Sequence, residues 1–197
     1  MTNKRWKIHK FGGSSLANAD CFRRVAKILL SYEDGRMGVV VSAMGGMTDA
    51  LIDLTTLAEH DDDRFVPALH TIGERYSEIV KSLLVGDIRI SILEAWNKDS
   101  SDVLDLLNAI ALVKSAPQRS RDVIAGYGEI WSARLLSAFL GKEAPSRAGT
   151  WIDARNVVVV KDTELGPTVL WAESQNKFDS ELSSDFTGIT VITGFIA

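Results

Sequence analysis

Short apolar runs alternate with helical patterns in the first part of this chain. Residues 6–10 alternate between apolar and polar side chains, as a strand does. Residues 38–43 form a continuous apolar run, which is typical of a parallel strand that is buried on both faces. Between them, Asn18 can cap a helix that runs to about Ser31, because apolar residues recur there at helical spacing. Strand, helix and strand in this order predict a βαβ unit.

The middle and the end of the chain follow different patterns. Residues 48–141 are nearly all helical in their periodicity, with three separate apolar stripes. Strand signals return at residues 150–152 and 157–160, and a polar helix is expected at about 169–182. The last strand is expected at residues 189–196, which are apolar on both faces. This order predicts an α/β protein that contains a long helical segment.

Composition excludes several classes of protein. A hydrophobic fraction of 46% in 197 residues can form a sizeable core, and this length predicts one domain or one domain plus part of a second. The net charge of -4 gives no electrostatic reason to expect a nucleic acid or an anionic membrane surface as a partner. No apolar stretch reaches the roughly 20 residues of a membrane helix. The single cysteine, Cys21, excludes an intramolecular disulfide and fits a reducing cytoplasm.

The first candidate site lies where the first strand ends, in the sequence K-F-G-G-S-S of residues 10–15. Glycines let the backbone approach a ligand closely, and backbone N–H groups there can bind an anion. Lys10 adds a mobile positive charge. Together with Gly12, Gly13 and Ser14, it suits a phosphoryl group. The stretch matches neither the P-loop pattern nor G-x-G-x-x-G, and an ordinary tight turn with a surface lysine explains these six residues equally well.

A second glycine pair follows the second strand, in V-S-A-M-G-G-M-T-D at residues 41–49. The carboxyl ends of parallel strands open on one edge of the sheet, where ligands bind. We therefore expect Ser42 to lie close to Lys10. The alternative is a second tight turn, in which Ser42 and Thr48 act as local caps.

A third motif, G-Y-G-E-I-W-S-A-R-L-L-S, covers residues 126–137 and places two glycines inside a helix or at its start. Each glycine costs roughly 1 kcal/mol relative to alanine in a helix interior, which indicates that close approach or a break is useful there. Glu129 follows directly, on the first turns of the helical pattern, where its carboxylate can bind a substrate ammonium. A solvated helix glutamate is the alternative interpretation.

Together these three motifs resemble those of the aspartokinases, which belong to the amino-acid kinase superfamily. The resemblance extends from residue 7 to T-G-F-I at residues 193–196, and it includes W-I-D-A-R at residues 151–155. The first and third motifs are most similar to the N-terminal part of bifunctional aspartokinase/homoserine dehydrogenases. The resemblance implies a three-layer αβα sandwich around a mainly parallel sheet.

The resemblance also implies a reaction. An aspartokinase uses ATP and Mg²⁺ to phosphorylate the side-chain carboxylate of L-aspartate, which gives 4-phospho-L-aspartate. This step is the entry to lysine, methionine and threonine biosynthesis. L-Aspartate and ATP are therefore the expected small-molecule partners, and the cytoplasm is the expected compartment.

The matching family positions carry roles over to particular residues. The lysine that matches Lys10 steadies charge on the transferring phosphoryl group, and the loop that matches residues 12–14 supplies phosphate-facing N–H groups. The positions that match Ser42 and Thr48 line the aspartate and phosphate region. The glutamate that matches Glu129 binds the α-ammonium of aspartate. We expect no metal ligand among the side chains of this chain.

Finally, the resemblance implies how much of the family's kinase domain this chain covers. In the family, T-G-F-I is followed by a segment rich in Gly, Arg, Ser and Asp, by the nucleotide-binding half and by regulatory domains. Residues 1–197 are therefore expected to be the N-terminal portion of an amino-acid kinase domain, inactive alone, with an unpaired sheet edge and exposed apolar surface. The last strand is expected to lack some of the neighbouring strands and covering helices that it needs. The parent protein is expected to form a homo-oligomer. The alternatives are a non-catalytic remnant that binds aspartate or a partner subunit, and an amino-acid kinase with a different carboxylate substrate.

Overall fold

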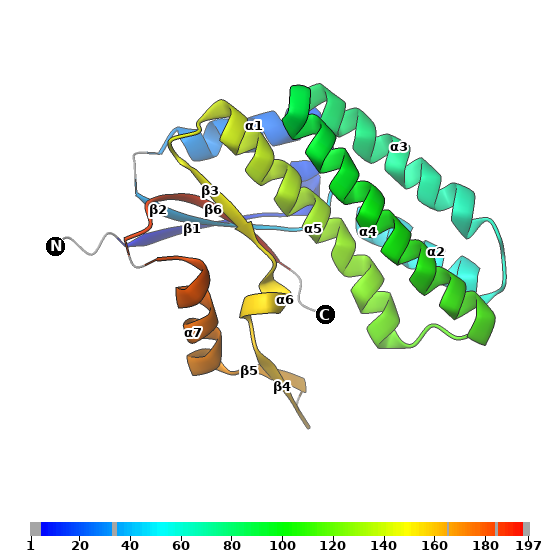
Figure 1. Ribbon diagram of the computed structural model, residues 1–197. Helices are drawn as coiled ribbons and strands as arrows, with labels where there is room; N and C mark the ends of the chain where they lie inside the picture. Colours follow the sequence, from blue (N-terminus) through cyan, green and yellow to red (C-terminus); the bar gives the residue numbers. More distant parts are fainter. Residues whose placement is uncertain (1–4, 33–34, 165, 184, 195–197) are drawn as a thin grey trace.

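A parallel sheet forms the centre of the molecule, and helices lie on both of its faces (Figure 1). This arrangement is seen in a computed structural model, which describes residues 5–32, 35–164, 166–183 and 185–194. The α/β class with a parallel sheet, predicted above, is confirmed. The sheet has four strands, in the order β1 (Trp6–Phe11), β2 (Arg36–Val41), β6 (Gly188–Thr193) and β3 (Ala148–Ile152).

The first βαβ unit forms as the pattern predicts. The Asn18 side chain accepts a hydrogen bond of 3.0 Å from the Cys21 N–H, and this cap starts α1 (Ala19–Leu30). β1 and β2 then pair in parallel, with Lys10 opposite Val40. The helix buries its apolar stripe in the hydrophobic core through Phe22, Val25, Ala26 and Leu29.

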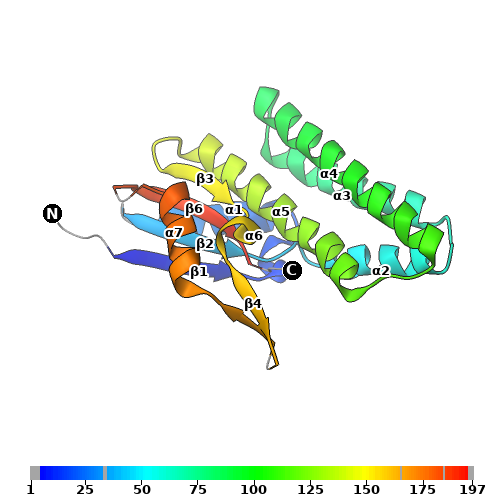
Figure 2. The ribbon, with the colours of Figure 1, turned by 60° about the horizontal axis from the view of Figure 1, so that its bottom comes forward.

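The helical middle of the chain is confirmed as four helices that form an antiparallel group beside the sheet (Figures 1 and 2). The fourth of these helices, α5 (Gln118–Glu143), packs on β3 and β6, so it joins the helical group to the sheet. None of the described helices is long and apolar enough to cross a membrane. The four helices are α2 (Met47–Glu59), α3 (Phe65–Leu83), α4 (Gly86–Val113) and α5 (Gln118–Glu143).

The strand predicted at residues 157–160 is wrong. Residues 154–157 form the short helix α6 (Ala154–Val157), because the Asp153 carboxylate accepts a hydrogen bond from a backbone N–H of its first turn. β-Branched valines favour a strand locally, but this cap and the burial of Val157 oppose it. A strand begins only with β4 (Val160–Thr163), which pairs with β5 (Gly166–Val169) in a hairpin outside the main sheet.

The polar helix expected at about 169–182 is confirmed as α7 (Trp171–Glu181). It lies on the opposite side of the sheet from α5 (Figures 1 and 2). The buried Ser174 hydroxyl accepts a hydrogen bond of 2.9 Å from the Val159 N–H, which ties α7 to the segment after α6. The two helices also contact each other directly.

The last strand is shorter than expected, and it has neighbours on both sides. β6 pairs with β2 and with β3, so the expectation that neighbouring strands of β6 are missing is wrong. Residues 195 and 196 of the expected strand lie outside the described residues. Among the described strands, β1 forms one edge of the sheet, and its Ile8 side chain is 65% exposed.

Candidate functional site

The two glycine-rich loops touch each other at the carboxyl edge of the sheet. A Cβ added to Gly13 would lie 2.8 Å from the Ala43 carbonyl oxygen, and one added to Gly45 would lie 3.2 Å from the Gly13 carbonyl oxygen. Such a close approach of two backbones needs residues without side chains. The loop after β1 and the loop after β2 therefore form one continuous backbone surface.

Lys10 lies over this surface. It is an exposed residue near the end of β1, and its Nζ lies 3.8 Å from the position that a Cβ on Gly12 would occupy. The structure gives its ammonium no hydrogen bond or ion pair with any described residue. Ser14 is exposed in the short 3-10 turn η1 (Gly13–Leu16) that follows. A cation that has no partner among the described residues and lies above partly exposed backbone can meet an anionic ligand.

Ser42 and Thr48 flank the second glycine pair. The Ser42 N–H donates to the Phe11 carbonyl at 3.0 Å, which extends the pairing of β1 and β2 by one residue. Thr48 is exposed in the first turn of α2. The N-cap of α2 is Gly46, and no side chain caps the helix. The alternative role of Ser42 and Thr48 as caps of this helix is therefore absent from the structure.

Glu129 lies in the interior of α5, not on the first turns of a helix as the pattern indicated. Its side chain is half-buried, which differs from a fully solvated helix glutamate. Its Oε2 lies 3.6 Å from the position of a Cβ on Gly194, the residue after β6. Lys10, Ser42 and Glu129 thus lie at the carboxyl ends of three neighbouring strands, β1, β2 and β6.

α5 is fixed against the sheet where it carries Glu129. The Ser132 hydroxyl, one turn further along, donates to the Ser42 carbonyl at 2.8 Å. On another face of α5, the Asp99 carboxylate of α4 accepts from Trp131 Nε1 at 3.1 Å and from Arg134 Nη1 at 2.7 Å. These contacts hold the Glu129 turn between the loop after β2 and α4.

Two residues near Glu129, Tyr127 and Arg155, have raised pKa values. Burial, with the charges of Asp102 and Asp99, raises the pKa of Tyr127, which precedes the Gly128–Glu129 pair. Arg155 lies 5.9 Å from the centre of the Tyr127 ring and forms an ion pair of 2.7 Å with Asp153. This ion pair raises the pKa of Arg155, so the guanidinium stays charged there.

Sequence patterns gave no sign of Arg75, which contacts both glycine loops. Arg75 belongs to α3, and its Nη2 donates to the Gly45 carbonyl at 2.6 Å and to the Ala17 carbonyl at 3.2 Å. These partners are 30 and 58 residues away in the sequence. No local motif could have revealed contacts at such separations.

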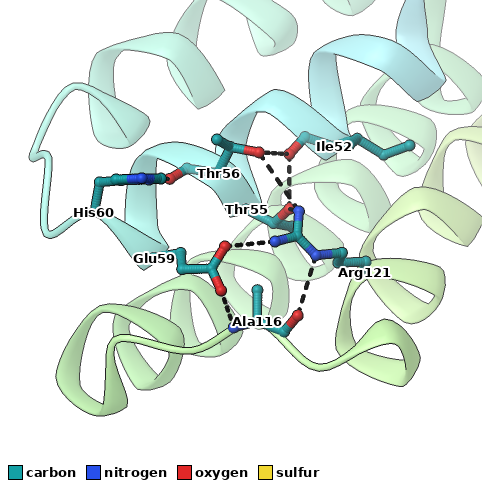
Figure 3. Close-up of polar contacts among 7 residues, drawn as sticks. All are labelled: Ile52, Thr55, Thr56, Glu59, His60, Ala116 and Arg121. Atoms are coloured by element: carbon teal, nitrogen blue, oxygen red, sulfur yellow. Dashed lines mark hydrogen bonds and ion pairs between the residues drawn. The ribbon is translucent and has the colours of Figure 1, made fainter.

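A polar cluster lies around Glu59, the last residue of α2, at the opposite end of this helix from its N-cap Gly46 (Figure 3). Arg121, at the start of α5, forms an ion pair of 2.5 Å with Glu59 and donates to the Ala116 carbonyl at 3.0 Å. The Ala116 N–H donates in turn to Glu59 at 3.1 Å. The cluster joins the end of α2 to the start of α5, the two helices that carry Thr48 and Glu129.

No group of three or more His, Cys, Asp or Glu side chains that could hold a metal ion exists among the described residues. A cavity of about 650 Å³ lies at the other end of α1 from Lys10, with Lys27, Ser82 and Lys142 in its lining. The lining of this cavity includes none of the site residues that the three sequence motifs predict.

Comparisons with known proteins agree with one another. The model of the family described as "Amino acid kinase family" matches residues 5–197. Bifunctional aspartokinase/homoserine dehydrogenase 2 (chloroplastic) of Arabidopsis thaliana is 34% identical over 195 residues, which cover 98% of this chain and 21% of that protein. Bifunctional aspartokinase/homoserine dehydrogenase 2 of Escherichia coli strain K12 is 35% identical over 150 residues, which cover 76% of this chain and 18% of that protein. The chain spans about a fifth of the length of these curated relatives.

Among solved structures, E. coli aspartokinase III in complex with aspartate and ADP (R-state) superposes with a TM-score of 0.78. It is 25% identical in sequence, and the match covers 95% of this chain and 40% of that one. The fold of the described residues is therefore also found in a protein that was solved with aspartate and ADP.

Proposed function

Because the chain belongs to the amino acid kinase family, we propose that it forms the aspartate-binding and phosphoryl-binding part of an aspartokinase. In the proposed reaction a side-chain carboxylate oxygen of L-aspartate attacks the γ-phosphorus of ATP. The bond from that phosphorus to the β,γ-bridging oxygen breaks, and 4-phospho-L-aspartate and ADP are the products. The observation that carries the proposal is the placement of Lys10, the joined glycine loops and Glu129 at the ends of three neighbouring strands.

Lys10 and the loop after β1 are assigned to the phosphoryl group. Phosphoryl transfer depends on positioning and on neutralising charge more than on covalent chemistry by the protein. The Lys10 ammonium is exposed above Gly12, where it can pair with phosphoryl oxygens. Gly12 and Gly13 have no side chain and Ser14 has a short one, so their own side chains do not block an anion from the backbone.

Glu129, Ser42 and Thr48 are assigned to the amino-acid substrate. A half-buried carboxylate suits an ammonium group, because partial exclusion of water strengthens the attraction between opposite charges. The hydroxyls of Ser42 and Thr48 can donate to carboxylate or phosphoryl oxygens. This assignment favours a substrate that carries both an ammonium and a carboxylate.

The two expected cofactors fit the described residues unequally. ATP would supply the phosphoryl group, and the glycine loops with Lys10 suit its phosphates. Mg²⁺ is expected from the family resemblance, but the described residues contain no cluster of three ligating side chains. We therefore assign no residue of this chain to Mg²⁺ and derive no step through it.

Calorimetric binding of L-aspartate and succinate to this chain tests the substrate assignment separately from turnover. Succinate has both carboxylates but lacks the ammonium. We expect L-aspartate to bind at least about tenfold more tightly, because a hydrogen bond to a charged group contributes about 1.5–3 kcal/mol. Glu129→Gln should remove this preference. Equal binding of the two ligands to the unchanged chain would contradict the assignment.

L-Glutamate is the second ligand to test, because a kinase for a different carboxylate substrate remains the alternative. One added methylene changes binding by about 1–3 kcal/mol in a fitted pocket. Tighter binding of L-glutamate than of L-aspartate would favour that alternative. The same Glu129→Gln variant serves as the control, because both amino acids carry the ammonium.

A further inference from the structure

We propose that Arg75 is a positioning residue that locks the two glycine loops of the site into one rigid unit. Neither the sequence motifs nor the family comparisons assign it a role. The coupling of the loops is a property of the fold. Its consequence for aspartate binding rests on the proposed function, so the two parts need separate measurements.

One nitrogen of Arg75 bridges the two loops. Its Nη2 donates to the carbonyl of Gly45, just before α2, and to the carbonyl of Ala17, just after the η1 turn. The two loops also touch directly, since a Cβ on Gly45 would lie 3.3 Å from the Ala17 Cβ. Arg75 therefore ties together, from a third element, two loops that are already in contact.

No described residue offers the guanidinium a competing partner of opposite charge. Arg75 is half-buried, and in the described part of the chain no carboxylate lies within ion-pair distance of it. A partly buried cation must be satisfied by hydrogen bonds, because leaving it unpaired is costly. The two loop carbonyls satisfy this need, so the loops and the arginine stabilise each other.

Arg75 also determines how the loop enters α2. The peptide that joins Gly45 to Gly46 is planar, so a fixed Gly45 carbonyl fixes the direction of the Gly46 N–H. Gly46 adopts a left-handed conformation, with φ of 75°, and it is the N-cap of α2. The Gly45 carbonyl therefore links Arg75 to the orientation of the first turn of α2, which carries Thr48.

The helix that carries Arg75 is itself held firmly. A Cβ on Gly73 would overlap the ring of Trp96, so α3 and α4 pack at close range through this pair. Tyr76 is fully buried, and its hydroxyl lies 3.4 Å from the Trp131 carbonyl, which it contacts as a donor. Trp131 follows Glu129 by two residues on α5. Through Arg75 and Tyr76, α3 thus connects the glycine loops with the turn that presents Glu129.

Hydrogen exchange of backbone amides tests the coupling without any ligand. We compare the unchanged chain with Arg75→Met and Arg75→Lys, and Lys81→Met provides a control that removes an exposed charge from the same helix. Arg75→Met should speed exchange at least about tenfold in residues 12–17 and in residues 43–47, but not in the distant hairpin of β4 and β5. Arg75→Lys should restore part of the protection, because lysine can still reach one carbonyl.

Two results would overturn the coupling. One is exchange in either loop that is unchanged in Arg75→Met. The other is an equal rise across the whole chain, which would mean general destabilisation instead of local coupling. If Arg75→Met does not fold, Arg75→Lys decides alone, because it should raise exchange in both loops and nowhere else.

Calorimetric titration with L-aspartate tests the consequence for the site. Arg75→Met should weaken binding about tenfold, with Arg75→Lys between it and the unchanged chain, whereas Lys81→Met should have no effect. Unchanged affinity in Arg75→Met would overturn the positioning role. If L-aspartate does not bind the unchanged chain, the proposed function fails, but the exchange experiment still decides whether Arg75 couples the loops.

Discussion

Gly128 of α5 lies directly against Ala43 in the loop after β2. A Cβ on Gly128 would come within 2.9 Å of the Ala43 Cβ and within 3.2 Å of the Met47 Cγ. The helix can approach the loop this closely because residue 128 has no side chain. The approach brings the next residue, Glu129, to the end of β6, where its carboxylate lies beside Gly194.

This contact predicts opposite effects for two neighbouring glycines. A Cβ on Gly126 would meet nothing within 4 Å, so Gly126→Ala should raise the free energy of unfolding by up to about 1 kcal/mol through helix propensity. Gly128→Ala makes the same change in propensity but overfills the contact with Ala43. We expect Gly128→Ala to be less stable than Gly126→Ala by about 1–3 kcal/mol in urea unfolding. Equal stabilities of Gly128→Ala and Gly126→Ala would contradict this expectation and show that the loop after β2 can move to accommodate the added methyl group.

Lys10 is expected to act on the reaction and not on the fold. In a full-length aspartokinase that contains this sequence, Lys10→Ala should lower kcat at least about a hundredfold, because one preorganised charge partner of the transition state is lost. Lys7→Ala, on the opposite face of the same strand, should leave kcat nearly unchanged. A fall of less than tenfold for Lys10→Ala would remove Lys10 from the proposed catalytic role.

Gly46 has a backbone conformation that other residues rarely adopt. Its φ of 75° lies in the left-handed region, where a Cβ costs roughly 1–2 kcal/mol. Gly46→Ala should lower the free energy of unfolding by about this amount. Gly126→Ala is the control, because this residue lies within α5 and a Cβ there meets nothing within 4 Å. Thermal unfolding of both variants provides the measurement, and equal melting temperatures would contradict the expectation.

The Glu59–Arg121 cluster predicts a contribution to stability that depends on pH. The hydrogen bond from the Ala116 N–H, followed by the Arg121 guanidinium, holds the pKa of Glu59 below its ordinary value of 4.5, although partial burial acts in the opposite direction. Since the pKa is lower in the folded state than in the unfolded state, ionised Glu59 stabilises the fold above pH 4.5. This stabilisation is lost as the pH falls below 4.5 and through the folded pKa.

Urea unfolding at a series of pH values checks this prediction. Glu59→Gln should be less stable than the unchanged chain at pH 7, and the gap should narrow as the pH falls below about 4.5. Glu78→Gln, which changes an exposed glutamate of α3, should follow the unchanged chain. A constant gap between Glu59→Gln and the unchanged chain at every pH would contradict the assignment.

Much of the fold could be predicted from local patterns. The Asn18 cap, the apolar stripe of α1 and the apolar run of β2 act over a few residues, so the first βαβ unit follows from them. The same reasoning failed at residues 157–160. Four valines favour a strand, but the Asp153 cap starts a helix before them and Val157 is buried in its last turn.

The sequence by itself determined where the glycine motifs fall relative to the strands, and hence that Lys10 and Ser42 lie at one edge of a parallel sheet. Only the tertiary structure decided that β6 lies between β2 and β3, that Glu129 reaches the end of β6, and that Arg75 joins the two loops. The physical reason is separation along the chain. Caps and apolar periodicity act between residues a few positions apart, whereas these contacts depend on how whole helices pack after the chain has folded.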